Sequence, residues 1–379
     1  MSIYLKSIHI NKLFHLSHFD INVCEGGDKR HLLITGPNGT GKTLLLNAIA
    51  DCLERISKDA SLDFLHSGLA SSDKVTLTLN DVELLPKSVA DKQFLLAYYG
   101  DQRRSEFKEV KNPEKPDLEY RDLKVNKVRE FIKFLVDLKV QRALADGENA
   151  KEYVHEIDEW FESFIKILRD LFEDQELKLE FDFKSYAFFI HSLGKIFKFT
   201  ELSAGYSAAL DIIVDLILKM QSREHLTRAF NMPGIVLIDE IETHLHLKMQ
   251  KTILPLLSTL FPNVQLIVTT HSPFVLSSLA DAVAYDLLRH EEIDDLTSYS
   301  YDALAEGYFG VDMASGKMQE SVGRLEVLTQ KTSLTLLEKD ELKQLVKEIK
   351  EIPDAVAPAI KERYYAALAT MTNEGKESL

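Results

Sequence analysis

Residues 32–43, Leu-Leu-Ile-Thr-Gly-Pro-Asn-Gly-Thr-Gly-Lys-Thr, decide the fold. They contain the pattern G-x-x-x-x-G-K-[ST] and lie between an apolar run at residues 31–35 and a helical pattern at residues 44–55. A loop of this pattern turns backbone N–H groups toward phosphate oxygens at a helix N-terminus, where the helix dipole also favours negative charge. We predict that Lys42 reaches the β and γ phosphates of a nucleotide and that Thr43 binds Mg²⁺. The predicted nucleotide-binding residues of the loop are Gly36, Pro37, Asn38, Gly39, Thr40, Gly41, Lys42 and Thr43.

A second motif supplies the acidic groups that such a loop uses. The apolar run at residues 235–238 is followed at once by Asp239 and Glu240. This pattern predicts a buried parallel strand that delivers two carboxylates at its carboxyl end, where ligands of open α/β sheets bind. We expect Asp239 to hold Mg²⁺ and Glu240 to orient or deprotonate the attacking water. Two adjacent acids after such a strand favour hydrolysis over nucleotide binding alone.

Three more segments lie at the ends of predicted strands or helices. The apolar run at residues 266–268 leads into Thr269-Thr270-His271-Ser272-Pro273, which places a histidine at the end of another strand. Leu202-Ser203-Ala204-Gly205-Tyr206 precedes a long helical pattern upstream of the acidic strand. Gln102 follows a predicted strand at residues 94–99.

The order of these motifs resembles that of ABC-type ATPases: Walker A, a glutamine-bearing loop, an LSGGQ-like signature, Walker B and a switch histidine. The resemblance covers about residues 1–288, apart from an insertion. Residues 239–246, Asp-Glu-Ile-Glu-Thr-His-Leu-His, and residues 270–273, Thr-His-Ser-Pro, are more similar to the RecF and OLD-like branch than to transporter ATPases. The chain is also similar to the ATPase subunits of the PARIS and Septu anti-phage defence systems.

The resemblance implies ATP as the nucleotide and Mg²⁺ as its ion, with Lys42, Glu240 and His271 as catalytic residues. It further implies that a glutamine touches Mg²⁺ and the attacking water. We expect this residue to be Gln102, and the alternatives are Gln93 or a loop glutamine without such a role.

In this family the signature serine and glycine of one subunit contact the γ-phosphate bound to another subunit. The resemblance therefore implies that Ser203 and Gly205 act in trans, and that the active form is a homo-oligomer, at least a head-to-head dimer. Ala204 and Tyr206 depart from the usual Gly and Gln, which affects the expected backbone geometry and γ-phosphate sensing of this loop.

Four polar residues beside these motifs have less specific interpretations. Arg103 and Arg104 either bind phosphate or DNA, or form a solvated basic pair. Glu242 and His244 lie where the family carries its D-loop, so an interface role is expected for them.

The motifs and apolar runs predict an α/β fold: an ABC-type P-loop head with a mixed sheet and an N-terminal antiparallel β part. Its two segments are residues 1–104 and 177–290. Apolar residues at helical spacing predict a helical insertion at residues 105–176, which is too short for the coiled-coil arm of SMC-type ATPases. Residues 291–379 are predicted to be mainly helical and to serve assembly or partner binding. The acids at residues 291–295 lie in a polar stretch without an apolar strand to deliver them, so we assign no Toprim nuclease to this chain.

Composition limits the remaining possibilities. The formal net charge of −15 argues against a protein that coats nucleic acid over its whole surface. Residues 121–142 carry seven basic and three acidic side chains, and this stretch either faces DNA or forms a solvated helix face. No apolar run approaches the roughly 20 residues that span a bilayer, and the N-terminus lacks a signal pattern, so we expect a soluble, cytoplasmic protein without a membrane partner. Cys24 and Cys52 have no paired spacing that predicts a disulfide framework or a zinc site.

These observations lead to one expected function and two alternatives. We expect a Mg²⁺-dependent ATP-binding and hydrolysing subunit of a bacterial anti-phage defence complex. It would act as a sensor or scaffold that controls a separately encoded effector, a nuclease in our expectation, through ATP-dependent head dimerisation. The alternatives are a RecF-like ATPase of DNA repair or chromosome maintenance, and an ATP-locked oligomeric scaffold with little turnover.

Overall fold

The computed structural model describes residues 3–24, 28–58, 69–103, 106–120, 122–221, 230–301, 303–305, 316–331, 333–352 and 358–370. The chain divides into two compact units, Met1–Ser300 and Tyr301–Leu379. In the described part of the chain, no helix combines the length and the apolar character needed to cross a membrane.

The larger unit is built on a six-stranded sheet with the strand order β13-β12-β3-β11-β10-β6. Five strands run parallel, and β13 is antiparallel at one edge. The strands are β3 (His31–Thr35), β6 (Leu95–Tyr99), β10 (Gly234–Ile238), β11 (Val264–Thr269), β12 (Ala282–Asp286) and β13 (Glu291–Asp294). Every residue of β3, β10, β11 and β12 is buried, as expected where helices cover both faces of a parallel sheet. The predicted α/β class is confirmed.

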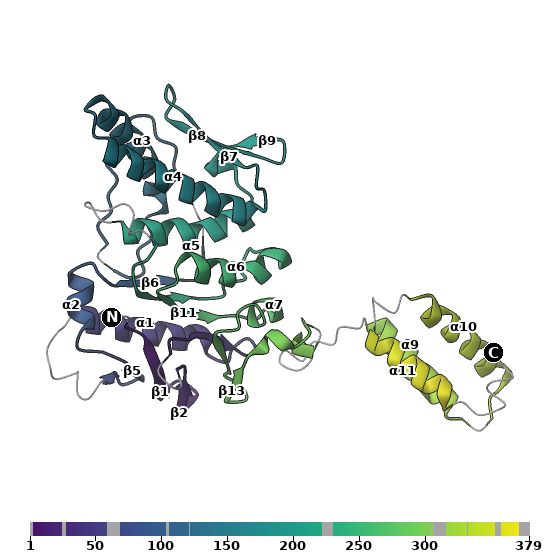
Figure 1. The fold of residues 1–379 in the computed structure, drawn as a ribbon. Coiled ribbons are helices and arrows are strands. Elements are labelled where there is room, and N and C mark those ends of the chain that lie inside the picture. The colour runs from purple at the N-terminus through teal and green to yellow at the C-terminus, as the bar shows by residue number, and fades with distance from the viewer. Residues whose placement is uncertain are drawn as a thin grey trace. The chain divides into compact units, whose positions relative to one another are not determined.

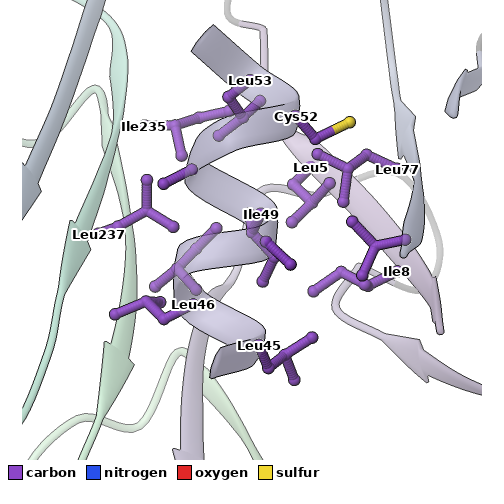
Figure 2. Close-up of a cluster of buried hydrophobic side chains, with 14 of the residues drawn as sticks. Leu5, Ile8, Leu45, Leu46, Ile49, Cys52, Leu53, Leu77, Ile235 and Leu237 are labelled. Carbon is purple, nitrogen blue, oxygen red and sulfur yellow. The ribbon is translucent and has the colours of Figure 1, made fainter. Parts of the chain in front are cut away.

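Helix α1 (Lys42–Lys58) separates this sheet from a four-stranded antiparallel sheet (Figure 1). The strands of that second sheet, in the order β2-β1-β5-β4, are β1 (Leu5–Leu13), β2 (Leu16–Asn22), β4 (Leu69–Ser71) and β5 (Val75–Leu79). Figure 2 shows Leu5 and Ile8 of β1 on one side of α1, and Ile235 and Leu237 of β10 on the other. The helix that begins at the P-loop lysine is therefore held from two sides by apolar contacts.

Helices α5 (Ala204–Met220) and α6 (Leu247–Leu260) cover the opposite face of the six-stranded sheet (Figure 1). Beyond α5 lie the two helices of the insertion, α3 (Phe131–Gly147) and α4 (Lys151–Phe172). A small antiparallel sheet follows, formed by β7 (Lys178–Asp182), β8 (Ala187–Ser192) and β9 (Lys195–Phe197). The described part of this unit also contains short helices, which are α2 (Leu85–Ala90), α7 (Pro273–Leu276) and the 3-10 turns Val128–Glu130, Phe199–Glu201 and Leu296–Ser298.

Aromatic rings at helical spacing join the insertion to the rest of the larger unit. Phe131 of α3 and Phe164 of α4 lie 5.2 Å apart between ring centroids, and Phe131 also lies 5.9 Å from Phe199. All three rings are buried. The periodicity that predicted helices in this region therefore marks the side that packs.

The described helices of the smaller unit include α9 (Gly316–Thr329), α10 (Leu336–Glu351) and α11 (Pro358–Ala369). They share a small apolar core that includes Leu325, Leu342 and Ile360. The unit begins ten residues later than the predicted boundary at residue 291, because Glu291–Asp294 form strand β13 and pair with β12. The acids of this polar stretch therefore lie within an edge strand of the sheet. An edge strand rich in charged residues reads as a polar loop in the sequence.

Candidate functional site

Four adjacent strands end at one edge of the six-stranded sheet, and each delivers a predicted residue there. The P-loop follows β3, the segment with His271 follows β11, Asp239 follows β10 and Gln102 follows β6. The hydrogen-bond ladder continues past the strands, since the Asp239 N–H donates to the Tyr99 carbonyl at 2.7 Å. Gln93 precedes β6, at the other end of that strand. The structure thus favours Gln102 over Gln93 as the glutamine near this edge.

The P-loop has the backbone conformation that its glycines permit. Gly36 has φ +139° and Gly41 has φ +95°, in the left-handed region that other residues rarely adopt. A Cβ atom on Gly41 would lie 3.0 Å from Leu16 Cδ1 of the antiparallel sheet. The Lys42 Nζ donates to the carbonyl oxygens of Gly36 at 2.8 Å and Pro37 at 3.0 Å. The lysine is therefore held by its own loop through bonds that phosphate oxygens could replace.

The charge of Lys42 faces a group of carboxylates. Burial lowers the pKa of Lys42, and the nearby carboxylates of Glu240, Glu242, Asp239 and Asp286 oppose that shift. A buried cation close to several anions is expected to stay charged at neutral pH.

Asp239 and Thr43 are suited to Mg²⁺. Asp239 is 1% exposed, and the Thr269 hydroxyl donates to its Oδ1 at 2.5 Å, while no donor of the described residues bonds to Oδ2. Thr43 is exposed in the first turn of α1. Among the described residues no cluster of His, Cys, Asp and Glu could hold a metal by itself. One carboxylate and one hydroxyl are nevertheless a usual protein share for Mg²⁺, which takes its other ligands from phosphates and water.

Glu240 and His271 lie side by side. The Glu240 Oε1 is 3.7 Å from the His271 Nε2, which is buried and has no hydrogen-bond partner among the described residues. Burial lowers the pKa of His271 and the Lys42 charge lowers it further, against the opposing effect of the surrounding carboxylates. The imidazole is therefore expected to be neutral at pH 7, beside a carboxylate that can accept a proton.

Glu242 has partners within its own chain. The Thr270 hydroxyl donates to Glu242 Oε2 at 2.8 Å, and the His271 N–H donates to Glu242 Oε1. Glu242 therefore fixes the segment that carries His271. The sequence predicted only an interface role for Glu242, not this contact within the chain. His244 is exposed and has φ +70°.

The signature segment, residues 202–206, begins helix α5. Ser203 is the exposed N-cap residue. Gly205 is buried against the turn that follows β10, and a Cβ on it would lie 3.2 Å from the His244 carbonyl oxygen. Tyr206 stacks on Phe172 of the insertion, with ring centroids 4.2 Å apart and planes 6° apart. Packing against α4 thus accounts for the tyrosine at the place of the usual glutamine.

Arg103 and Asp286 are two residues whose surroundings the sequence did not reveal. Arg103 is only 6% exposed, so the interpretation as a solvated basic residue is wrong; Arg104 lies outside the described residues. Asp286 is 1% exposed and ends β12 next to Thr35, the last residue before the P-loop. A detectable signal existed for Asp286, since an apolar run at residues 282–285 delivers it in the same way as the run that delivers Asp239.

The turn at Phe14 and His15 is a further element of the site that the sequence did not single out. The His15 ring Nε2 lies 3.2 Å from the carbonyl oxygen of Thr40 in the P-loop. Phe14, at the tip of the turn, is 82% exposed. The histidine that contacts the phosphate-binding loop is therefore preceded by an exposed aromatic residue.

The basic stretch at residues 121–142 is largely matched by acids of the same chain. Arg121 lies outside the described residues, and the Lys139 Nζ lies 3.9 Å from the centroid of the Phe161 ring. The other basic residues form ion pairs, which are Lys124–Asp51, Lys127–Asp117, Arg129–Glu106, Lys133–Glu130 and Arg142–Asp158. These pairs favour a solvated helix face over a DNA-binding stripe.

Comparison with known proteins gives relatives among Septu proteins and among retron ATPases. Septu protein PtuA of Bacillus mycoides (strain KBAB4) is 24% identical over an alignment of 379 residues. The alignment covers 92% of this chain and 50% of that protein. The "Retron Vc95 probable ATPase" of Vibrio cholerae serotype O1 biovar El Tor is 42% identical over 79 residues, 21% of this chain and 15% of that protein. The chain thus spans about half the length of the first relative and less of the second.

Among solved structures, an SmcHead bound to the C-winged helix domain of ScpA matches with a TM-score of 0.42 and 13% identity, over 75% of this chain and 94% of that chain. A family model described as "AAA domain, putative AbiEii toxin, Type IV TA system" matches residues 71–277, from the antiparallel sheet through the switch histidine. Because this match covers more than half of the 379 residues, the chain belongs to that AAA_21 family.

Proposed function

We propose that the chain is a Mg²⁺-dependent ATPase whose active site is completed by the signature segment of a second copy. The observation that carries the proposal is the common strand edge at which Lys42, Asp239, Glu240 and His271 meet. These side chains supply a phosphate-binding cation, a metal ligand, a general base and a polar hydrogen-bond donor, the set that phosphoryl transfer to water needs.

Each residue has a defined task in this reaction. Lys42 would exchange its bonds to Gly36 and Pro37 for bonds to the β and γ phosphates. Asp239 and Thr43 would hold Mg²⁺, which offsets the negative charge of the phosphates. Glu240 would accept a proton from the attacking water, a role supported by its closeness to His271.

The neutral imidazole of His271 would donate from Nε2 to the γ-phosphate, which gives a partner to an atom that otherwise has none in the described part of the chain. The exposed Phe14 would lie against the base of the nucleotide, next to the P-loop.

The second copy would contribute Ser203 and Gly205. Ser203 is exposed at the N-terminus of a 17-residue helix, where backbone N–H groups favour an anion. The contacts of Gly205 and Tyr206 within the chain run to residues 244–249 and to Phe172 rather than to the P-loop. This supports a signature that meets ATP across an interface.

Mixing two inactive variants tests the shared site. Lys42→Ala removes the P-loop cation, and Ser203→Arg blocks the signature, so each purified variant should hydrolyse ATP at the background rate. A mixed dimer would contain one site with an intact Lys42 from one chain and an intact Ser203 from the other. Mixing should therefore restore part of the wild-type turnover, measured by phosphate release. If the mixture stays inactive while the wild-type chain turns over ATP, the signature does not act in trans.

We further propose that this ATPase serves anti-phage defence together with a separately encoded effector. The proposal is supported by the similarity to Septu protein PtuA and to a retron ATPase, as well as by family membership. Co-expression with the neighbouring gene should give a stable complex and phage resistance that Lys42→Ala abolishes. Strong ATP-dependent DNA binding by the chain alone, without resistance, would instead support the DNA-repair alternative.

A further inference from the structure

Arg103 is a buried cation beside the proposed general base, and neither the motifs nor the proposed chemistry use it. Its guanidinium donates from Nη2 to the backbone carbonyl of Glu240. Its Nε is buried and has no hydrogen-bond partner among the described residues. Burying a guanidinium is unfavourable unless its charge is compensated and its donors are used. We therefore expect the contact of Arg103 with the Glu240 carbonyl to offset the cost of burying the guanidinium.

The charge of Arg103 is compensated by acids around it. Burial lowers the pKa of Arg103, and the carboxylates of Glu242, Asp211, Asp239 and Asp101 act in the opposite direction. The guanidinium thus stays charged, and a charged donor makes a stronger hydrogen bond to a carbonyl than a neutral one does.

The peptide that Arg103 holds is strained. Glu240 has φ +44°, in the left-handed region, which costs a residue with a side chain on the order of 1 kcal/mol or more. Such a conformation persists where the surroundings fix it from several sides. Here the Glu240 N–H donates to the Thr269 hydroxyl at 2.8 Å, while its carbonyl accepts from Arg103. Thr269, the last residue of β11, therefore holds the backbone N–H of Glu240, and Arg103, in the loop after β6, holds its backbone carbonyl.

The same conformation decides where the Glu240 carboxylate lies. It places Oε1 3.7 Å from His271 Nε2, and Oε2 3.4 Å from the Thr243 hydroxyl that donates to it. A more ordinary φ at Glu240 would rotate the side chain away from the switch histidine, because the direction of Cβ follows the backbone.

We propose that Arg103 is a positioning residue, which holds the Glu240 peptide in the left-handed conformation so that the carboxylate lies beside His271 and the attacking water. The inference rests on the proposed hydrolytic function of this site. It differs from a phosphate clamp, because Arg103 acts on the base and not on the nucleotide.

Kinetics of three variants test the role. Arg103→Met keeps much of the side-chain volume and removes the donor, Arg103→Lys keeps the charge without the planar fork, and Arg142→Met is the control at an exposed, ion-paired arginine. For Arg103→Met we expect kcat to fall roughly 10- to 100-fold, as for a small misplacement of a catalytic group. KM for ATP should stay within about twofold, and Arg103→Lys should recover part of the loss. Arg142→Met should match the wild-type chain.

A double-mutant cycle separates positioning from the other roles. In a Glu240→Gln background, Arg103→Met should cause no further loss of turnover, because the group it positions no longer acts as a base. Further loss there, weaker binding of a non-hydrolysable ATP analogue, unchanged kcat in Arg103→Met, or failure of both Arg103 variants to fold would each overturn the proposal. A wild-type chain without turnover would overturn the proposed function and this inference together, whereas wild-type turnover with an unaffected Arg103→Met would overturn the inference alone.

Discussion

Two buried clusters of polar and charged residues in the larger unit differ in how completely their polar atoms are paired. The first, the helix cluster, consists of Tyr99, Tyr120, Asp215 and Lys219. Asp215 is fully buried and accepts from the Tyr99 hydroxyl at 2.8 Å, from Lys219 Nζ at 2.6 Å and from the Lys127 N–H at 2.7 Å. No atom of these four side chains is buried without a hydrogen-bond partner in the described part of the chain.

The second, the strand-edge cluster, surrounds the P-loop and includes the proposed catalytic residues. Six buried side-chain atoms of the described residues have no hydrogen-bond partner, and four belong to residues at this edge: Thr35, Arg103, His271 and Asp286. Unpaired buried polar atoms are unfavourable and uncommon in folded proteins. We infer that the satisfied cluster stabilises the fold, whereas the unpaired Nε2 of His271 in the second cluster marks where a ligand binds.

The largest expected effect separates catalysis from stability at the strand edge. Glu240→Gln should lower ATP turnover by on the order of 10³-fold, because it removes the proposed base, while the free energy of unfolding changes little. Phosphate release and urea unfolding measure the two quantities. Glutamine keeps the size of the side chain, so ATP binding serves as the control for an intact site. Normal turnover in this variant would contradict the role of Glu240 as the base and the catalytic role of the strand-edge cluster.

The helix cluster should respond in the opposite way. Asp215→Ala leaves Lys219 buried without its partner, and we expect a loss of about 3 kcal/mol in unfolding free energy. Turnover per folded molecule should stay near the wild-type value. The matched control is Asp158→Ala, which breaks an exposed ion pair with Arg142 and should cost less than about 1 kcal/mol. Equal losses in the two variants would show that pairing in the helix cluster carries no special stability.

The smallest effect concerns His31, a buried ring that is satisfied when neutral. Its Nδ1 accepts from the Leu266 N–H at 2.9 Å, and burial lowers the pKa of His31 from 6.5 to about 4. Between these two pH values the unfolded chain binds the extra proton, so stability rises with pH and is lost as pH falls below 6.5. The slope from this residue reaches at most about 1.4 kcal/mol per pH unit.

Unfolding of the wild-type chain and of His31→Asn at several pH values checks this slope. Asparagine cannot take up a proton in this range, so the difference between the two curves isolates the histidine from the carboxylates. Parallel curves between about pH 7 and 5 would contradict the assignment.

Much of the strand-edge cluster was predictable, because the relevant information is local in the sequence. An apolar run that ends in a polar residue predicted the positions of Lys42, Asp239 and His271 at one edge of a parallel sheet. The family resemblance added Ser203 and Gly205, whose action in trans remains a prediction.

The partners of several residues were not predictable, because they come from distant parts of the chain. Arg103 donates to the backbone carbonyl of Glu240, 137 residues later, and no local pattern in the sequence reveals that contact. The basic residues of the insertion looked like a positive stripe because acids such as Asp51, 73 residues from Lys124, are not visible to a local charge count. Local patterns thus predict which groups are present, while burial and pairing depend on the complete fold.

The stack of Tyr206 on Phe172 has a consequence for how such chains can change over generations. The two rings cover each other, so replacing one of them exposes the other and removes the reason for keeping it. Residues 172 and 206 are therefore expected to vary as a pair among relatives, with a small or polar residue at 172 wherever glutamine stands at 206. The helical insertion and the signature segment would then evolve together, because a change at residue 172 or 206 would favour a matching change at the other position.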